Sequence, residues 1–295
     1  MVLEYHQIGD EEERWTRTGE SFRNDLQYLY DHGYYLTSLA DLLDNRVSAP
    51  AGKTPVVLTF DDSNRSQFQF IVQADETLKV DPNSGLGILE AFTGEHRDFG
   101  RAATFCVLPG ADPPNDLFGQ PKYRQQKLRY LAQHGYDICN HTLWHGDLLE
   151  ETPQQATELI AHAQKAIQDA VPGYNVRVFN PPHGDYTDDI SIMTDGTFEG
   201  TTYHHQAILE VGSGPMTAPN HRDTDWLHVP RIQAIPEALD QWLTYFEQQP
   251  EKRYVSDGNP DQVVFPTDRM KDYLPTAGAR QVKSSDPAYV VIRLR

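Results

Sequence analysis

The stretch "TPVVLTFDD", residues 54–62, joins a strong strand signal to a pair of carboxylates. Its first seven residues form a continuous run of the kind found in parallel strands that are buried on both faces. A second run of this kind, "AATFCVL", occupies residues 102–108. The two runs predict neighbouring strands of an α/β sheet, with Asp61 and Asp62 placed where the first strand ends.

Helical patterns alternate with strand-like runs on both sides of this stretch. "YLYDHGYYLTS" at 28–38 and "YLAQHGYDICN" at 130–140 contain the same junction, in which a helix ends at Gly and a β-rich run follows. A helix is also predicted from Thr152, a candidate N-cap, with Pro153 at its first position. Shorter strand-like runs are "VRVFN" and "LHVPRI".

This alternation over about 250 residues predicts a β/α barrel or a doubly wound sheet, both of which carry their sites at the carboxyl ends of the strands. We expect one catalytic domain over residues 1–249. Within it, the polar and turn-rich residues 63–100 are expected to form an inserted loop or hairpin. The Pro-rich residues 250–295 are expected to form a C-terminal extension packed on the barrel.

Composition excludes some classes of partner. Forty-three acidic and 25 basic residues give a formal charge of -18, which argues against nucleic acid, because a phosphate backbone demands clustered Lys and Arg. No apolar run approaches the roughly 20 residues needed to cross a bilayer. The two cysteines, Cys106 and Cys139, lie in apolar runs and are expected to be buried free thiols rather than a disulfide.

Residues suited to catalysis follow four of the expected strands. They are His6 after "VLEY", Asp61 and Asp62 after "VVLTF", His141 and His145 in "HTLWH", and His183 in "PPHG". Taken singly, an Asp pair is usually a helix cap or a solvated turn, and an HxxxH pattern is as often an exposed helical face.

Taken together, these residues favour a metal site. Two imidazoles four residues apart can converge, and a carboxylate from a neighbouring strand end completes an open two-imidazole, one-carboxylate set. Such a site lowers the pKa of bound water to about 7. Of two adjacent aspartates, one can bind the ion while the other accepts the proton of the water.

"LTFDD", "NHTLWH" and "FNPPHGDY" resemble the first three motifs of the polysaccharide deacetylases, carbohydrate esterase family four. "LEYHQI" and "LHVPRI" further resemble the subgroup whose domain starts with a Tyr-His strand, and the resemblance covers about residues 2–248. It implies a distorted (β/α) barrel with about seven strands and one divalent metal ion, usually zinc. It also implies hydrolysis of N-acetyl groups of amino-sugar polymers.

The resemblance also assigns roles to individual residues. Asp61 is implied to be the general base, and the backbone N–H of His183 is implied to help hold the oxyanion. The implied metal ligands are Asp62, His141 and His145. Two motifs depart from the family pattern, because Ser63 stands where Gly is usual and Asn180 stands where the third motif has an arginine.

The arginine missing from the third motif normally holds the base aspartate. Arg231 in "HVPRI", expected at the end of the last barrel strand, is the candidate replacement, and a surface arginine on a closing strand is the alternative. Trp226, in a loosely matching fourth motif, either lines the substrate groove or packs in the core.

Release of the sugar amine needs an acid, which family members usually supply as a histidine from the last strand. Arginine cannot act as an acid near neutrality. We expect His6 in this place, because the first strand of a closed barrel lies beside the last. The alternatives are that the ring of His6 only satisfies a backbone carbonyl, or that His228 faces the pocket.

The sequence therefore predicts a metal-dependent hydrolase acting on carbon–nitrogen bonds other than peptide bonds, with an N-acetylated carbohydrate polymer or oligosaccharide as substrate. Three alternatives stay open: a de-O-acetylase on the same site, a carbohydrate-binding barrel with impaired catalysis, and a metal-independent amide hydrolase. The implied substrate lies in the cell envelope or outside the cell. We therefore expect an exported protein whose leader is absent from this chain, with a cytoplasmic protein as the alternative.

Overall fold

The computed structural model describes residues 1–273, 280–282 and 284–294. At its centre, β5 (Thr54–Phe60) lies between β1 (Val2–Tyr5) and β8 (Thr104–Val107), and all three strands are parallel. Every residue of β5 is buried, as its uninterrupted sequence pattern predicts. The remaining strands of the sheet are β9 (Asp137–Asn140), β10 (Val178–Phe179), β13 (Ala207–Ile208) and β14 (Ile232–Gln233).

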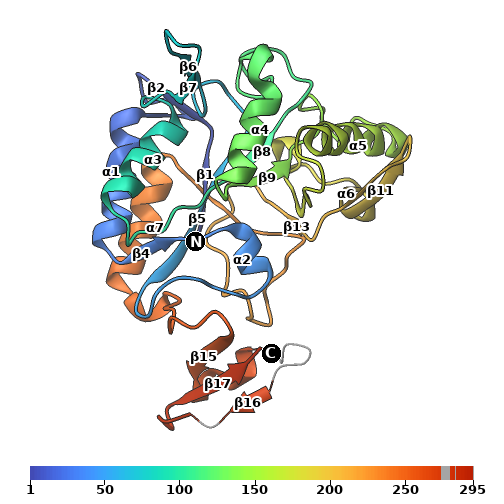
Figure 1. Ribbon diagram of the computed structural model, residues 1–295. Coiled ribbons are helices and arrows are strands. Elements are labelled where there is room, and N and C mark those ends of the chain that lie inside the picture. Colours follow the sequence, from blue (N-terminus) through green and yellow to red (C-terminus); the bar gives the residue numbers. More distant parts are fainter. Residues whose placement is uncertain (274–279, 283, 295) are drawn as a thin grey trace.

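The sheet curls into the distorted barrel that the sequence predicts (Figure 1). Its parallel strands run in the order β13-β10-β9-β8-β5-β1-β14, and β4 (Tyr34–Leu36) pairs with the first half of β5. The two ends of the sheet approach each other, because Leu209 bridges to Val229 and Leu3 pairs with Ile232. The expectation that the first strand lies beside the last is therefore confirmed.

Helices cover the outside of the sheet. They are α1 (Gly19–Asp31), α2 (Leu39–Leu43), α3 (Gly85–Glu95), α4 (Arg124–Gln133), α5 (Pro153–Ala170), α6 (Ser191–Thr194) and α7 (Pro236–Gln248). The predicted cap of α5 is present, since the Thr152 hydroxyl accepts a hydrogen bond from the backbone N–H of Gln155 at 3.3 Å. None of the described helices is long and apolar enough to cross a bilayer.

Short strand pairs and turns connect these elements. The pairs are β2 (Gln7–Gly9) with β3 (Thr16–Thr18), β6 (Phe70–Val72) with β7 (Leu78–Val80), and β11 (Asp195–Phe198) with β12 (Thr201–His204). The 3-10 turns are Pro121–Tyr123, Pro182–Gly184, Pro250–Lys252 and Thr267–Asp272.

Residues 63–100 are more regular than an inserted loop. The expected hairpin is present as β6 and β7, but residues 85–95 form helix α3, whose apolar side chains join the main core. A Cβ at Gly87 would collide with the carbonyl oxygen of Asp81. Glycine is a poor helix former, and the glycines that allow this close approach hide the helical pattern in the sequence.

The expectation of two free thiols is wrong, because Cys106 and Cys139 form a disulfide. The two residues are direct partners across the parallel pair β8 and β9, with their Cα atoms 4.4 Å apart. Their separation of 33 residues gives no sign of this pairing, which depends on the register of the two strands.

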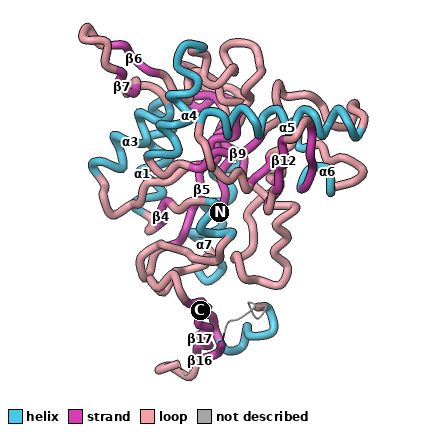
Figure 2. The backbone as a smooth tube through the Cα atoms, turned by 45° about the vertical axis from the view of Figure 1, so that its right-hand side comes forward, coloured by secondary structure: helices cyan, strands magenta, loops and turns pink. Residues whose placement is uncertain are grey.

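The C-terminal extension forms a small antiparallel sheet of β15 (Gln262–Pro266), β17 (Tyr289–Arg293) and β16 (Arg280–Val282). Figures 1 and 2 place it below the barrel, on the side where the strands begin. Backbone hydrogen bonds join the two parts, including Gly52 N–H to the Ser256 carbonyl and Ser256 N–H to the Lys53 carbonyl, both 2.9 Å.

Lys127 on α4 is a buried cation in the barrel wall. Its ammonium donates hydrogen bonds to the carbonyl oxygens of Phe68 at 2.7 Å and Phe118 at 2.8 Å. The rings of both phenylalanines lie within reach of its charge. Burial lowers the pKa of Lys127 to about 7, so the unfolded chain holds this proton more tightly than the folded protein.

We therefore predict that the free energy of unfolding of the parent, relative to Lys127→Met, rises between pH 7 and pH 10 by up to about 4 kcal/mol. The sign follows because only the unfolded chain stays protonated at Lys127 in this window. Denaturant unfolding of both proteins at several pH values measures the difference. A difference that stays constant over this range would contradict the buried position of Lys127.

Candidate metal centre and active site

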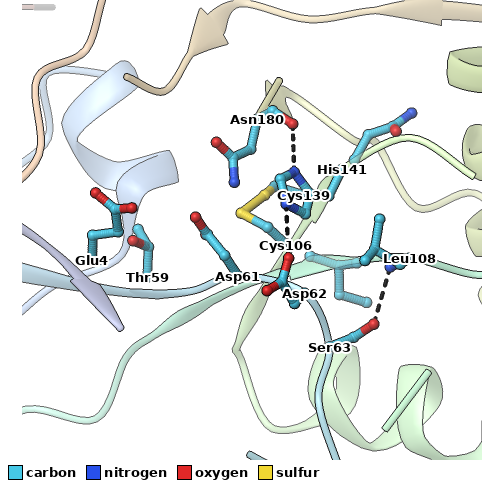
Figure 3. Close-up of a disulfide and its surroundings, with 12 residues drawn as sticks. Glu4, Thr59, Asp61, Asp62, Ser63, Cys106, Leu108, Cys139, His141 and Asn180 are labelled. Atoms are coloured by element: carbon cyan, nitrogen blue, oxygen red, sulfur yellow. Dashed lines mark hydrogen bonds and ion pairs between the residues drawn. A yellow bond between two sulfur atoms is a disulfide. The ribbon is translucent and has the colours of Figure 1, made fainter. Parts of the chain in front are cut away.

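The three predicted metal ligands meet at the carboxyl ends of the strands. Asp62 follows β5, and His141 and His145 follow β9. One carboxylate oxygen of Asp62 lies 3.3 Å from Nε2 of His141 and 3.4 Å from Nε2 of His145. Figure 3 shows Asp62 and His141 facing each other, with the Cys106–Cys139 disulfide beside them.

The donor atoms suit a small divalent ion. Ligand bonds of about 2.0–2.1 Å in a tetrahedral arrangement put neighbouring donor atoms about 3.3 Å apart. Nδ1 of His141 lies 2.6 Å from the carbonyl oxygen of Asn180, which leaves Nε2 to face the ion. Burial and the neighbouring His141 lower the pKa of His145 to about 4, so its ring is neutral and able to bind a metal.

The loop from His141 to His145 is stabilised by hydrogen bonds to its own polar side chains. The Asn140 side-chain oxygen accepts a hydrogen bond from Thr142 N–H at 2.9 Å, and the Thr142 hydroxyl accepts one from His145 N–H at 3.1 Å. Thr142 and His145 both have a φ of +68°, a conformation that non-glycine residues rarely adopt. These local bonds compensate the strain and turn both imidazoles toward Asp62.

Asp61 faces away from this set and forms a buried ion pair with Arg231. The guanidinium donates one hydrogen bond to each carboxylate oxygen of Asp61, both 2.9 Å long. Burial alone would raise the pKa of Asp61, but the Arg231 charge outweighs it and holds the pKa well below its usual range. Asp61 is therefore ionised near neutral pH.

Arg231 occupies the place that the sequence analysis proposes for a replacement arginine. It is fully buried, so it is not a surface residue, and it also donates to Asn180 Oδ1 at 3.1 Å. Asn180, which stands where the third motif has an arginine, thus accepts a hydrogen bond from Arg231, the arginine that contacts Asp61 in this structure. One detail differs from expectation, because Arg231 directly precedes β14 instead of ending the last strand.

His6 lies beside Asp61 and Glu4. Its Nε2 is 3.9 Å from an Asp61 carboxylate oxygen and 3.9 Å from a Glu4 carboxylate oxygen. The ring packs against Trp15, with ring centroids 4.5 Å apart. Among the described residues, no backbone carbonyl accepts a hydrogen bond from this ring, so the alternative of a purely structural His6 finds no support.

Glu4 is the residue at this site that the sequence analysis misses. Its side chain is fully buried, accepts a hydrogen bond from Gly212 N–H at 3.0 Å, and lies 3.7 Å from a nitrogen of Arg231. Burial raises its pKa, although the charge of Arg231 opposes the shift. A carboxylate inside the otherwise apolar strand "VLEY" is the sequence signal that marks it.

Glu4, His6 and Asp61 also lie close enough together to hold an ion. The guanidinium of Arg231 already supplies the positive charge between these two carboxylates. The cluster therefore suits proton transfer better than metal binding, and Asp62, His141 and His145 stay the predicted metal ligands.

Of the other candidate residues, His183 lies at the site, whereas His228 and Trp226 do not face Asp61. His183 lies at the site, with its ring centroid 4.5 Å from that of His145 and a φ of +61° in the turn that carries it. His228 is half-exposed and bound to Asp225 at 3.0 Å, which excludes it as the acid facing Asp61. Trp226 packs against a core cluster, as one of its two alternatives expects.

Comparison with known proteins agrees with this architecture. A polysaccharide deacetylase family model matches residues 96–197, which include His141, His145 and His183. A chitooligosaccharide deacetylase of Sinorhizobium fredii is 30% identical over 157 residues, 53% of this chain and 59% of that protein. The chain thus spans about three fifths of the length of this curated relative. Residues 96–197 are thus similar to the polysaccharide deacetylase family.

Solved structures support the fold. A Streptococcus pyogenes deacetylase in complex with acetate aligns over 82% of this chain and 96% of its own, with a TM-score of 0.60 and 20% identity. A Bacillus cereus polysaccharide deacetylase aligns over 82% of this chain and 68% of its own, with a TM-score of 0.59 and 18% identity. At these identities the comparison establishes the distorted barrel alone. The Tyr-His subgroup stays a prediction.

We predict that the purified protein binds about one divalent ion per chain and that His141→Ala, which removes one of three ligands, loses or greatly weakens this binding. Equilibrium dialysis against zinc, followed by elemental analysis, measures the content. Asp61→Asn is the matched control and should keep the ion, because Asp61 is paired with Arg231. A parent-like metal content in His141→Ala would contradict the ligand set.

Proposed function

We propose that this protein hydrolyses N-acetyl groups of an amino-sugar polysaccharide and releases acetate. The observation that carries the proposal is the ionised Asp61, fixed by Arg231, beside an open set of two imidazoles and one carboxylate. The match to the family model and the relative described as a chitooligosaccharide deacetylase support the class of substrate. A zinc ion held by Asp62, His141 and His145 would polarise the acetyl carbonyl and acidify its own water.

In this mechanism Asp61 accepts the proton of the attacking water. The ion pair with Arg231 keeps the carboxylate charged and fixed, although the same pair makes it a weak base. This loss of basicity is tolerable only if the water is itself acidified, which is what a neighbouring divalent ion provides. Proton acceptance by Asp61 therefore depends on acidification of the water by the neighbouring ion.

His6 is proposed to protonate the departing amine. An amine is a poor leaving group until it is protonated, and His6 is the imidazole next to Asp61 that is not part of the metal set. Its ring lies between Trp15 and the carboxylate of Glu4, which restricts its orientation. The backbone N–H of His183, in the turn beside His145, is proposed to help hold the oxyanion.

An exported protein is the cellular setting that we propose. Disulfides persist in oxidising environments, and the buried Cys106–Cys139 disulfide suits such a compartment. The proposed polymer substrate also lies in the cell envelope or outside the cell.

The central experiment follows acetate release by zinc-loaded protein from N-acetylglucosamine oligomers of defined linkage and from O-acetylated sugars. We expect release from the amide substrates and loss of release after chelation. Release only from esters would identify a de-O-acetylase. Full activity after chelation would instead identify a metal-independent hydrolase, and tight glycan binding without any turnover would identify a binding barrel.

We predict that His6→Ala retains the fold and the metal but loses amide hydrolysis by about 10²- to 10⁴-fold, the usual contribution of a proton-transfer residue. The loss should be milder on 4-nitrophenyl acetate, whose leaving group needs no proton. Steady-state rates on both substrates give the comparison. Equal losses on both, or none on either, would remove His6 from the mechanism.

A further inference from the structure

A second cavity lies at the opposite end of the barrel from the metal centre. It has a volume of about 660 Å³, which is in the usual range for small-molecule sites. Its barrel wall includes Tyr34 and Thr54, with which β4 and β5 begin, whereas the catalytic residues follow strand ends. Its other wall comes from the C-terminal extension, including Tyr273 and Tyr289. We call this cavity the basal cleft.

The two parts of the chain are joined at both ends of the basal cleft. Near residues 49–53 the Ser256 hydroxyl donates a hydrogen bond to the Ala49 carbonyl at 2.6 Å, beside the backbone bonds to Ser256 described above. At the other end Arg222 N–H donates to the Asp272 carbonyl at 2.8 Å, and His221 bridges to Tyr273. These contacts fix the two walls of the basal cleft relative to each other.

Phenol groups line the basal cleft without protein partners. Among the described residues, no group shares a hydrogen bond with the hydroxyl of Tyr34, Tyr254 or Tyr273. None of these three hydroxyls is a buried unsatisfied atom, so they reach the space of the cleft and are free to bond water or a ligand there. Burial raises the pKa of Tyr34 and Tyr254 to about 12, so both remain neutral and can donate as well as accept.

The charges around the basal cleft are mostly engaged. Arg253 stacks over the ring of Tyr34 at 4.3 Å and donates to the Thr54 hydroxyl and the His32 carbonyl. Arg269 pairs with Asp272 at 2.6 Å. Lys252, which also lines the cleft, is accompanied there by the acidic Glu251 and Asp257. The lining therefore offers no surplus positive charge for a phosphate or carboxylate.

We propose that the basal cleft binds a neutral oligosaccharide. The exposed ring of Tyr289 suits the apolar face of a pyranose, whereas the rings of Tyr34 and Tyr273 are covered by Arg253 and Phe265 and offer their hydroxyls. Unpartnered phenols suit sugar hydroxyls, and the balanced charge selects against an ionic ligand. This site is separate from the catalytic one, and a polymer bound there would be retained near the enzyme between turnovers. The proposal is independent of whether the metal centre hydrolyses amides.

The test uses full-length Asp61→Asn protein with ring-¹³C tyrosine, so that the N-acetylglucosamine tetramer used as probe is not consumed. We expect the tetramer to shift the tyrosine signals that disappear in Tyr254→Phe and Tyr273→Phe. Removing both hydroxyls should weaken this binding by about fivefold for each hydrogen bond lost. Tyr245→Phe, whose ring lies on α7 outside the cleft lining, is the matched control and should bind like the parent.

Two results would overturn the proposal. The first is an affinity for the tetramer that is unchanged in the Tyr254→Phe, Tyr273→Phe double variant. The second is an equal shift of the cleft tyrosines by inorganic phosphate, which would mean an anion site. The proposed deacetylation is tested apart from this, because acetate release by the parent protein fails or succeeds whatever the cleft tyrosines bind.

Discussion

The buried guanidinium of Arg231 is the constraint on which the catalytic end of the barrel depends. It binds side chains of Thr59 and Asp61 from the β5 segment, Asn180 beyond β10, and the carbonyl oxygen of Glu210 beyond β13. A fully buried cation is stable only when its donors are paired. The strand ends must therefore converge on it, and this convergence sets Asp61 at the edge of the proposed metal site.

The same constraint separates the side chains of the two adjacent aspartates. Asp61 turns toward Arg231, Glu4 and His6, whereas Asp62, with a φ of +73°, turns toward the imidazoles of His141 and His145. On one side, the guanidinium of Arg231 balances the carboxylates of Glu4 and Asp61. On the other side, the carboxylate of Asp62 has no such cation among the described residues and is available to a metal ion. Asn180 connects the two sides, since its side chain binds Arg231 and its carbonyl oxygen binds His141.

The features that the sequence predicts correctly are those determined by local pattern. The buried strand over residues 54–60 and the capped helix from residue 153 follow from periodicity and capping, and the grouping of Asp62 with the histidines follows from strand-end placement. The features it misses depend on tertiary packing. Helix α3 is hidden by glycines, and the Cys106–Cys139 bond depends on strand register. Glu4 becomes interpretable only once its neighbours in space are known.

The central claim is that this barrel holds one ion with Asp62, His141 and His145 while Arg231 keeps Asp61 out of the coordination sphere. A crystal structure of zinc-loaded protein, with anomalous data collected at the zinc absorption edge, tests it most directly. The account predicts one strong peak bonded to those three side chains, with both hydrogen bonds between Arg231 and Asp61 intact. A peak between Glu4, His6 and Asp61, with Arg231 displaced, would contradict it.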